Sequence, residues 1–310
     1  MSTYLRDVAA ARVRPTTLHS YEQFARLYIN PRLGHGRLDR IGPQHVTAFY
    51  SKLSKTLAPS SVRRVHAVLR RALTVALRWG LIDSNPTQLV DPPSMRAREI
   101  RPYTVAEARA FLRAASRDRT EARWVIALNL GLRQGEVLGL GWAEIDFEKK
   151  LITIDRALQR QPDGSLQLVR TKTRRCQRVV PMPSTVMTSL ERRRSQKANG
   201  RGLLGSEWHE SDLVFTTQLG TPVHPRNDYR VFQAIIGKAG LRRIRLHDLR
   251  HTAASLLLSQ GVAARVLMEI LGHTQISVTL NTYSHVAPEL TRVATERLED
   301  LLCRSSDSGG

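Results

Sequence analysis

Apolar residues in the first hundred positions recur with the spacing of helices. The stretch "SVRRVHAVLRRALTVALRW", residues 61–79, predicts a long amphipathic helix. Six apolar residues share one of its faces: Val62, Val65, Leu69, Ala72, Leu73 and Ala76. Elsewhere on this helix Arg64, Arg71 and Arg78 recur every seven residues and form a basic stripe. Such a stripe is typical either of a solvated surface or of a face that follows phosphates, and the pattern leaves both open.

A polar, proline-rich stretch, "DSNPTQLVDPPSMRAREIRPY", interrupts this periodicity at residues 83–103 and is typical of an interdomain linker. Directly after it, Thr104 and Glu107 have the spacing of a capping box, which marks the start of a new helix. We therefore expect four segments: a helical domain over 1–92, a linker over 93–102, a second domain over 103–302 and a disordered tail over 303–310.

The second domain contains a break in the helical pattern. "LITIDRAL" and "SLQLVR" alternate on either side of "QPDG", which predicts a hairpin, and "QRVVPM" follows as a third strand after a turn containing "KTRR". Helical patterning then resumes around 184–197, 226–239, 247–260 and 262–271. The predicted fold class is mainly α, with a small antiparallel β-sheet in the C-terminal domain.

The charge of the chain points to its partner. Lys and Arg number 48 against 27 Asp and Glu, giving a net charge of +21 and a pI near 11.1. The excess is shared about equally by the chain before and after residue 99, so it is not a basic tail. A polyanionic partner is expected, because phosphate-rich surfaces gain affinity by counterion release. A basic secreted protein or a ribosomal protein would also fit.

Cysteine usage and hydropathy narrow the range of possible compartments and partners. Cys176 and Cys303 cannot form a disulfide framework, and neither has a metal-ligand spacing, which favours a reducing cytoplasm. No apolar run approaches the roughly 18 residues that span a membrane, and the N-terminus lacks the apolar core of a signal peptide. The expected partner is intracellular nucleic acid, with no membrane involved.

Candidate chemistry is concentrated in "HDLRHTAASLLLSQG", residues 247–261. Its apolar face is expected to comprise Leu249, Ala253, Leu256 and Leu257. His247 and Arg250 lie in the first turn, where they form an anion site or simply cap the helix. His247 and His251 have a spacing that zinc ligands use, but Asp248 replaces the glutamate of zinc proteases and Arg250 would repel the cation. We therefore expect no metal.

Further reactive or charged groups lie outside this segment. Arg133 follows Gly131 at a helix boundary, where it can reach into a cleft, and Glu136 either orients the guanidinium or forms an ordinary surface pair. Lys172 lies at the predicted hairpin turn. Tyr283 follows His273 by ten residues in "LGHTQISVTLNTYSH", a polar segment with too few apolar residues for a core.

The order of these residues resembles the tyrosine recombinases, the family of the phage-type integrases. The matching text is "GLRQGEVLGL", "TKT" before "RVVPM", "HDLRHTAASLL", "LGH" and "TYSH". The segments "TLHSYEQFARLYINPRLG" and "SSVRRVHAVLRRALTVALRWGLI" are similar to the core-DNA-binding domain of that family. The core-binding text starts almost at once, so a preceding arm-binding domain either never existed or has been removed.

The resemblance implies a role for each matching residue. Tyr283 would be the nucleophile, Arg133 and Arg250 would clamp the scissile phosphate, and Lys172 would be the general acid. His247 and His273 would assist, and Glu136 would support Arg133 from behind. DNA contacts are expected from a set of arginines: Arg63, Arg64, Arg70, Arg71, Arg78, Arg174 and Arg175.

The implied protein is a two-domain DNA clamp that cleaves and rejoins DNA through a 3′-phosphotyrosyl intermediate, without metal, ATP or another cofactor. Its partners would be double-stranded DNA with a core-type attachment site, three further copies in a synaptic tetramer, and accessory DNA-bending or directionality factors. We expect it to integrate or excise a phage or other mobile element in the cytoplasm of a bacterial host. A type IB topoisomerase is disfavoured by the N-terminal half, and a DNA-binding regulator is disfavoured by the filled catalytic positions.

Overall fold

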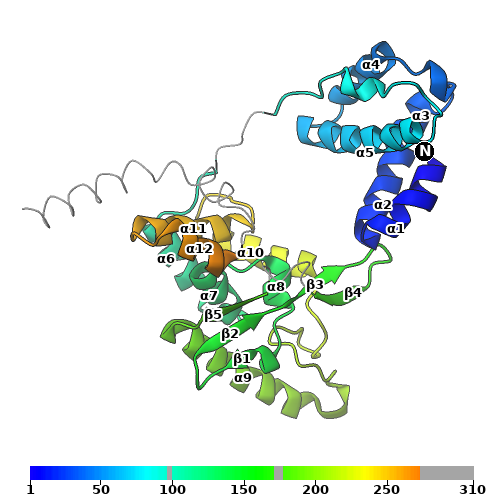
Figure 1. The fold of residues 1–310 in the computed structure, drawn as a ribbon. Coiled ribbons are helices and arrows are strands. Elements are labelled where there is room, and N and C mark those ends of the chain that lie inside the picture. Colours follow the sequence, from blue (N-terminus) through cyan, green and yellow to red (C-terminus); the bar gives the residue numbers. More distant parts are fainter. Residues whose placement is uncertain (96–99, 171–176, 273–310) are drawn as a thin grey trace, which may run out of the picture. The chain divides into compact units, whose positions relative to one another are not determined.

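The structure is a computed structural model that describes residues 1–95, 100–170 and 177–272 (Figure 1). It divides into two compact units, one of Met1–Glu99 with Gln161–Ser165 and the other of Ile100–Arg160 with Leu166–Gly310. Most of the described chain is helical and both sheets are antiparallel, which confirms the predicted fold class. Across the described ranges, every helix is too short or too polar to cross a lipid bilayer.

The first unit consists of helices alone within the part described. Its elements are η1 (Tyr4–Ala9), α1 (Ala10–Arg12), α2 (Pro15–Phe24), η2 (Ala25–Ile29), α3 (Asn30–Leu33), η3 (Leu38–Arg40), α4 (Pro43–Ser54), α5 (Pro59–Arg78) and η4 (Pro86–Gln88). The six apolar residues predicted to share a face of α5 are all buried. Five of them pack with Val46, Phe49 and Leu53 of α4, and Ala72 packs with Tyr4 and Ala9, so the period of 3.6 residues correctly identified the core face.

The second unit is built around α7. Its elements are α6 (Val105–Ala115), α7 (Glu121–Leu130), α8 (Gln134–Leu138), η5 (Trp142–Glu144), β1 (Ile145–Asp146), β2 (Leu151–Ile154), β3 (Arg156–Arg160), β4 (Leu166–Arg170), β5 (Arg178–Pro181), α9 (Ser184–Leu204), η7 (Gly205–Glu207), α10 (Pro225–Lys238), α11 (Asp248–Ser259) and α12 (Ala264–Leu271). Trp124 of α7 is fully buried between Phe111 of α6 and Phe232 of α10, with ring centroids 5.9 Å from each. Helix α7 thus contacts neighbours on several sides and fixes the position of the residues that follow it.

The strands form two sheets where the sequence predicted one. Strands β1, β2 and β5 make the first, with Ile152 opposite Val180, and β3 with β4 make a separate hairpin. Ile152 and Ile154 of β2 are buried. Arg156, at the start of β3, instead bonds Glu144 at 2.7 Å and Asp212 at 2.9 Å. The segment "LITI" is thus held by apolar contacts, whereas "RALQR" begins with an arginine held by ion pairs. The strand predicted over "LITIDRAL" is divided between them into β2 and β3.

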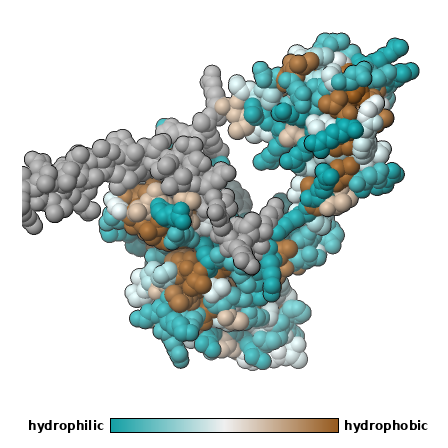
Figure 2. All heavy atoms as spheres, viewed as in Figure 1, coloured by the Kyte–Doolittle hydropathy of each residue, from teal (hydrophilic) through white to brown (hydrophobic). Residues whose placement is uncertain are grey.

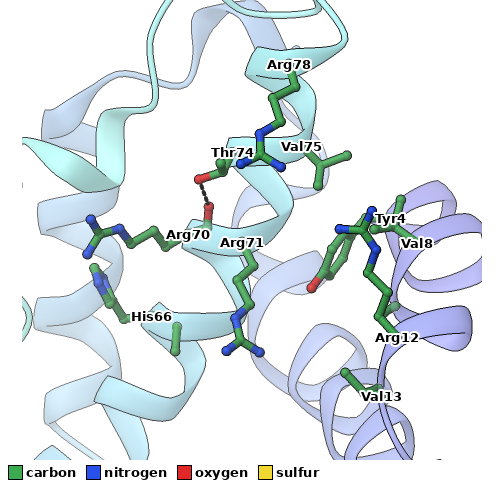
Figure 3. A pocket seen from close by; sticks show the side chains of 12 residues that line it. Tyr4, Val8, Arg12, Val13, His66, Arg70, Arg71, Thr74, Val75 and Arg78 are labelled. Carbon is green, nitrogen blue, oxygen red and sulfur yellow. Dashed lines mark hydrogen bonds between the residues drawn. The ribbon is translucent and has the colours of Figure 1, made fainter.

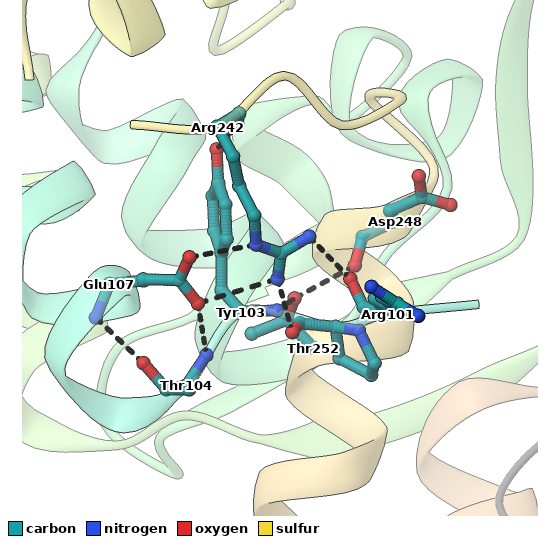
Figure 4. A network of polar contacts seen from close by, with 8 residues as sticks. Arg101, Tyr103, Thr104, Glu107, Arg242, Asp248 and Thr252 are labelled. Atoms are coloured by element: carbon teal, nitrogen blue, oxygen red, sulfur yellow. Dashed lines mark hydrogen bonds and ion pairs between the residues drawn. The ribbon is translucent and has the colours of Figure 1, made fainter. Parts of the chain in front are cut away.

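The start of the second unit is fixed by a polar network around Arg242 (Figure 4). The guanidinium donates to Glu107 Oε1 at 2.8 Å and to the carbonyl oxygens of Arg101 and Pro102 at 2.8 and 2.5 Å. Thr104 and Glu107 form the predicted capping box at the start of α6. These contacts hold residues 101–104 against the rest of the second unit.

The same network reaches the helix that carries His247 and Arg250. The Tyr103 backbone N–H donates to Thr252 Oγ1 at 3.0 Å, and that hydroxyl donates to the Asp248 carbonyl at 2.9 Å (Figure 4). Helix α11 is therefore held at its first turns by residues from the start of the second unit.

Over the face that Figure 2 shows, hydrophilic residues cover most of each unit and apolar residues form smaller patches.

Candidate active site

Arg133 lies between two helices, at the place where the chain turns sharply. Helix α7 ends at Gly131, whose φ of 60° is left-handed, and α8 starts directly after Arg133. The Arg133 side chain donates from Nη1 to Glu136 Oε1 at 2.7 Å and from Nη2 to the Gly272 carbonyl at 3.2 Å. The predicted contact with Glu136 is present. Since the arginine side chain stays 39% exposed, it can still meet a ligand from solvent.

Glu136 binds a second arginine that the sequence analysis missed. Arg178 of β5 donates from Nη2 to Glu136 Oε2 at 2.9 Å and from Nη1 to Oε1 at 3.3 Å, and both side chains are buried. Burial alone would raise the pKa of Glu136, but the hydrogen bonds and charge of Arg178, with the charge of Arg133, lower that pKa to about 2. Glu136 is thus a permanent anion that holds two cations.

Arg250 reaches the end of α7, two residues before Arg133. Its side chain is buried, with 2% exposed, and Nη1 donates to the Gly131 carbonyl at 2.9 Å. A Cβ built on Gly131 would overlap Leu271 Cδ2 and would lie 3.7 Å from Arg250 Cγ. Glycine at this position provides both the left-handed turn and the space that lets α11 and α12 approach.

His247 precedes the first turn of α11 and lines a small cavity of about 140 Å³ together with Arg123, Gln134 and Arg250. Burial lowers its pKa, and the positive charges of Arg250 and Arg133 lower it further. The imidazole is therefore neutral at pH 7. A neutral imidazole can accept a proton or donate a hydrogen bond, whichever its tautomer allows.

The neighbouring His251 stands at right angles to His247, with ring centroids 5.0 Å apart. Its pKa is lowered to about 4, first by burial and then by His247. The intervening acid, Asp248, accepts hydrogen bonds from Arg245 Nε and Nη2 at 3.1 and 2.8 Å. In the described ranges, no three His, Cys, Asp or Glu side chains lie close enough together to hold a metal ion.

Two arginines of the basic stripe, Arg71 and Arg78, line a groove of about 680 Å³ in the first unit, whereas Arg64 does not (Figure 3). Arg70, Arg71 and Arg78 of α5 line it opposite Tyr4 and Arg12. Three of the arginines expected to contact DNA are thus brought together, and Arg12, which the sequence analysis missed, joins them. Such a concentration of guanidinium groups suits a polyanion.

Arg63 and Arg64 are exposed on the same helix but do not line this groove. Arg63 Nη1 donates to the Pro93 carbonyl at 3.4 Å. The other predicted residues of both sites lie outside the described residues: Lys172, Arg174, Arg175, His273 and Tyr283.

Comparison with known proteins decides what kind of protein carries this cluster. Residues 103–289 match the model of the phage integrase family, and residues 1–54 match that of the phage integrase N-terminal SAM-like domain. The chain belongs to the phage integrase family. Its predicted class, a tyrosine-type site-specific recombinase, is thereby confirmed.

Several curated members of the phage integrase family align with nearly the whole chain. A "Tyrosine recombinase XerC-like" of Caldanaerobacter subterraneus subsp. tengcongensis is 30% identical, over 97% of this chain and 82% of its own length. An "Integrase" of Saccharopolyspora erythraea is 29% identical over 96% and 80%.

Solved structures of integrases share the fold. The Tn1549 transposon integrase in complex with a circular intermediate DNA superposes with a TM-score of 0.82 at 23% identity, covering 96% of this chain and 98% of that one. A lambda integrase dimer bound to a COC′ core site superposes with a TM-score of 0.66 at 15% identity, over 91% and 93%.

Proposed function

We propose that this member of the phage integrase family cleaves and rejoins double-stranded DNA at a core-type site through a 3′-phosphotyrosyl link to Tyr283. Residues 1–92 form a core-type DNA-binding domain, 93–102 a linker and 103–302 the catalytic domain. The observation that carries the proposal is the convergence of Arg250 and Arg133 at the end of α7. Although the two are distant in sequence, Arg250 donates to the carbonyl of Gly131, two residues before Arg133, and the positive charges of both arginines lower the pKa of His247.

The two arginines suit a phosphodiester because charge builds on its oxygens during attack. Guanidinium forks held in place before the reaction supply positive charge where it develops. If each charge-assisted hydrogen bond contributes about 1.5–3 kcal/mol, two forks account for several powers of ten in rate at about 1.36 kcal/mol per tenfold. Glu136 keeps Arg133 oriented, so little reorganisation is needed during the step.

In the proposed step Tyr283 Oη forms a bond to phosphorus as the bond from phosphorus to the 5′ oxygen breaks. The phenol proton passes to a base, for which neutral His247 is suited, and Lys172 gives a proton to the leaving 5′ oxygen. His273 assists at the phosphate. The phosphotyrosyl ester keeps the bond energy, so a 5′ hydroxyl of another strand can reverse the step without ATP.

DNA is held by the arginines of the first unit. The groove lined by Arg12, Arg70, Arg71 and Arg78 supports this assignment. We extend it to Arg63 and Arg64 of the same unit, and we add Arg174 and Arg175 from the second unit. Relatives of the chain include a putative prophage phiRv2 integrase of Mycobacterium tuberculosis and a transposase from transposon Tn916 of Enterococcus faecalis, and one solved neighbour is a lambda integrase tetramer bound to a Holliday junction. We infer a homo-tetramer that integrates or excises a mobile element in the bacterial cytoplasm, with accessory bending or directionality factors.

The test uses the DNA segment that the protein protects from nuclease, prepared as a nicked suicide duplex. We expect a covalent protein–DNA adduct that survives denaturation and forms in the presence of EDTA. Tyr283→Phe removes the nucleophilic oxygen and should abolish the adduct while DNA binding persists.

Tyr229→Phe is the matched control, because Tyr229 is an exposed tyrosine of α10 in the same unit, and this variant should retain the adduct. An adduct that persists in Tyr283→Phe would exclude the proposed nucleophile. Loss of the adduct in EDTA would exclude the metal-free chemistry.

A further inference from the structure

Arg178 is a buried arginine whose guanidinium forms several polar contacts inside the second unit. It begins β5, only 9% of its surface is exposed, and its guanidinium bonds two elements distant in sequence. Nε donates to the Ile270 carbonyl near the end of α12 at 2.7 Å, and the two terminal nitrogens donate to Glu136 of α8. One planar group thus joins a strand to two helices.

These bonds belong to a closed ring of polar contacts. Glu136 binds Arg133 on its other side, and Arg133 Nη2 reaches the Gly272 carbonyl, two residues beyond the carbonyl that Arg178 binds. The ring therefore runs from Arg133 through Glu136 and Arg178 to the end of α12 and back. Because Glu136 stays ionised throughout the physiological range, the ring does not open with pH.

Each element in the ring leads to a proposed catalytic residue. Arg133 precedes α8, Lys172 lies six residues before Arg178, and His273 follows Gly272 directly in the sequence. Gly272 has a φ of 68°, and a Cβ built there would lie 2.9 Å from Arg178 Nη1. The turn before His273 is therefore packed directly against this guanidinium.

We propose that Arg178 is a positioning residue for strand cleavage: it aligns Arg133 through Glu136 and fixes the points from which the segments carrying Lys172 and His273 depart. This inference rests on the proposed function of those residues. Misplacement by about 1 Å can cost about a hundredfold in rate, so a group that sets several positions at once has a large effect without touching DNA.

Lysine tests the geometry while keeping the charge. In Arg178→Lys a single ammonium cannot donate to both Glu136 oxygens and the Ile270 carbonyl in the planar arrangement of the guanidinium. We expect single-turnover cleavage of the suicide duplex to fall roughly a hundredfold, with DNA affinity changed less than about threefold, since a buried side chain has no contact with phosphates.

The matched control is Arg193→Lys. Arg193 of α9 in the same unit is also buried, with 3% exposed, but it donates to the Val214 carbonyl and to Thr216 rather than to the ring. A general loss of stability should affect both variants, so the unfolding midpoint is measured beside the rate. We expect only Arg178→Lys to lose cleavage beyond what its unfolded fraction explains.

A second readout separates positioning from folding. A duplex with sulfur in place of the leaving 5′ oxygen needs no general acid, because a thiolate leaves unprotonated. The deficit of Arg178→Lys should be smaller on this substrate than on the oxygen one. Wild-type cleavage by Arg178→Lys, an equal loss in Arg193→Lys, or an identical deficit on both substrates would overturn the inference. None of these bears on Tyr283→Phe, whose retained adduct would instead refute the proposed function.

Discussion

Glu136 is a buried acid that forms ion pairs with two arginines. Its side chain is 4% exposed and accepts hydrogen bonds from Arg133 and Arg178. Removing one partner of a buried pair leaves an uncompensated charge, which typically destabilises a protein by about 3–5 kcal/mol. The free energy of unfolding should therefore depend strongly on this carboxylate being ionised.

The pH dependence of Glu136→Gln tests that dependence. The folded pKa of about 2 lies below the ordinary value of 4.5, so the ionised acid stabilises the fold above pH 4.5 and this contribution is lost as pH falls toward 2. The shift corresponds to about 3 kcal/mol. We expect wild type to exceed Glu136→Gln in unfolding free energy at pH 7, and the gap to shrink by about that amount near pH 2.

Denaturant titrations at several pH values measure the gap. Other carboxylates titrate in the same range, so the comparison is made against Glu148→Gln, which alters an exposed acid of the same unit. That control should follow the wild-type curve throughout. A gap that stays constant from pH 7 to pH 2 would mean that the Glu136 charge does not stabilise the fold.

For single residues, contacts between near neighbours in sequence could be predicted from the sequence, whereas contacts between distant residues could not. Arg133 and Glu136 are three residues apart, so their contact follows from a helix start. Arg178 is distant from both in sequence, and it was not singled out because the chain has 48 Lys and Arg residues. One signal could have found it: alternation along "RVVP" places Arg178 on the inward side with Val180, and an inward-facing charge needs a buried partner.

Helices α7 and α12 of the second unit end at glycines in the left-handed conformation, and both ends lie at the candidate site. Gly131 terminates α7 and Gly272 terminates α12. The end of α7 also packs against Leu271, the last residue of α12, at the position where a Gly131 side chain would be. The glycine thus determines how closely the two helix ends approach.

Gly131→Ala should therefore cost more than backbone strain. A non-glycine residue in this region costs about 1–3 kcal/mol, and displacing Leu271 from the packed position adds about 1–3 kcal/mol. Gly240→Ala is the matched control, because its φ is 62° and a Cβ there would contact nothing within 4 Å. Both variants should lower the free energy of unfolding in denaturant, and Gly131→Ala should lower it more. Equal losses would show that the contact with Leu271 is not restrictive.

Periodicity located the elements but not their assembly. The helices predicted around 184–197, 226–239, 247–260 and 262–271 correspond to α9, α10, α11 and α12, because each presents apolar residues at helical spacing to a core. The break between β2 and β3 was missed, since it depends on Arg156 meeting Glu144 and Asp212, which lie elsewhere in the chain. Pairing between distant residues has no periodic signature.

For the molecule as a whole, the net charge of +21 predicted a nucleic-acid partner but not the surface that meets it. The stripe on α5 indicated part of one wall of the groove, because Arg71 and Arg78 follow the helical repeat, but its third member, Arg64, lies outside the groove. Arg12 comes from α1, a separate short helix, and only folding brings it opposite α5 (Figure 3). A charge count gives the sign of the partner, whereas the groove requires the tertiary structure.

The salt dependence of DNA binding tests whether the groove follows the phosphate backbone. Each phosphate neutralised by a cation contributes about −0.9 to the slope of log affinity against log salt concentration. We expect Arg12→Gln to make the slope shallower by about one, and Arg12→Gln with Arg78→Gln by about two, equally on cognate and unrelated duplexes.

Arg37→Gln is the control, since Arg37 does not line the groove and already pairs with Asp39 at 2.9 Å. If Arg12→Gln left the slope of wild type while Arg37→Gln reduced it, the phosphates would have to lie along another face of the first unit. A loss of affinity confined to one sequence would instead assign Arg12 to base recognition, because phosphate contacts weaken binding to every duplex alike.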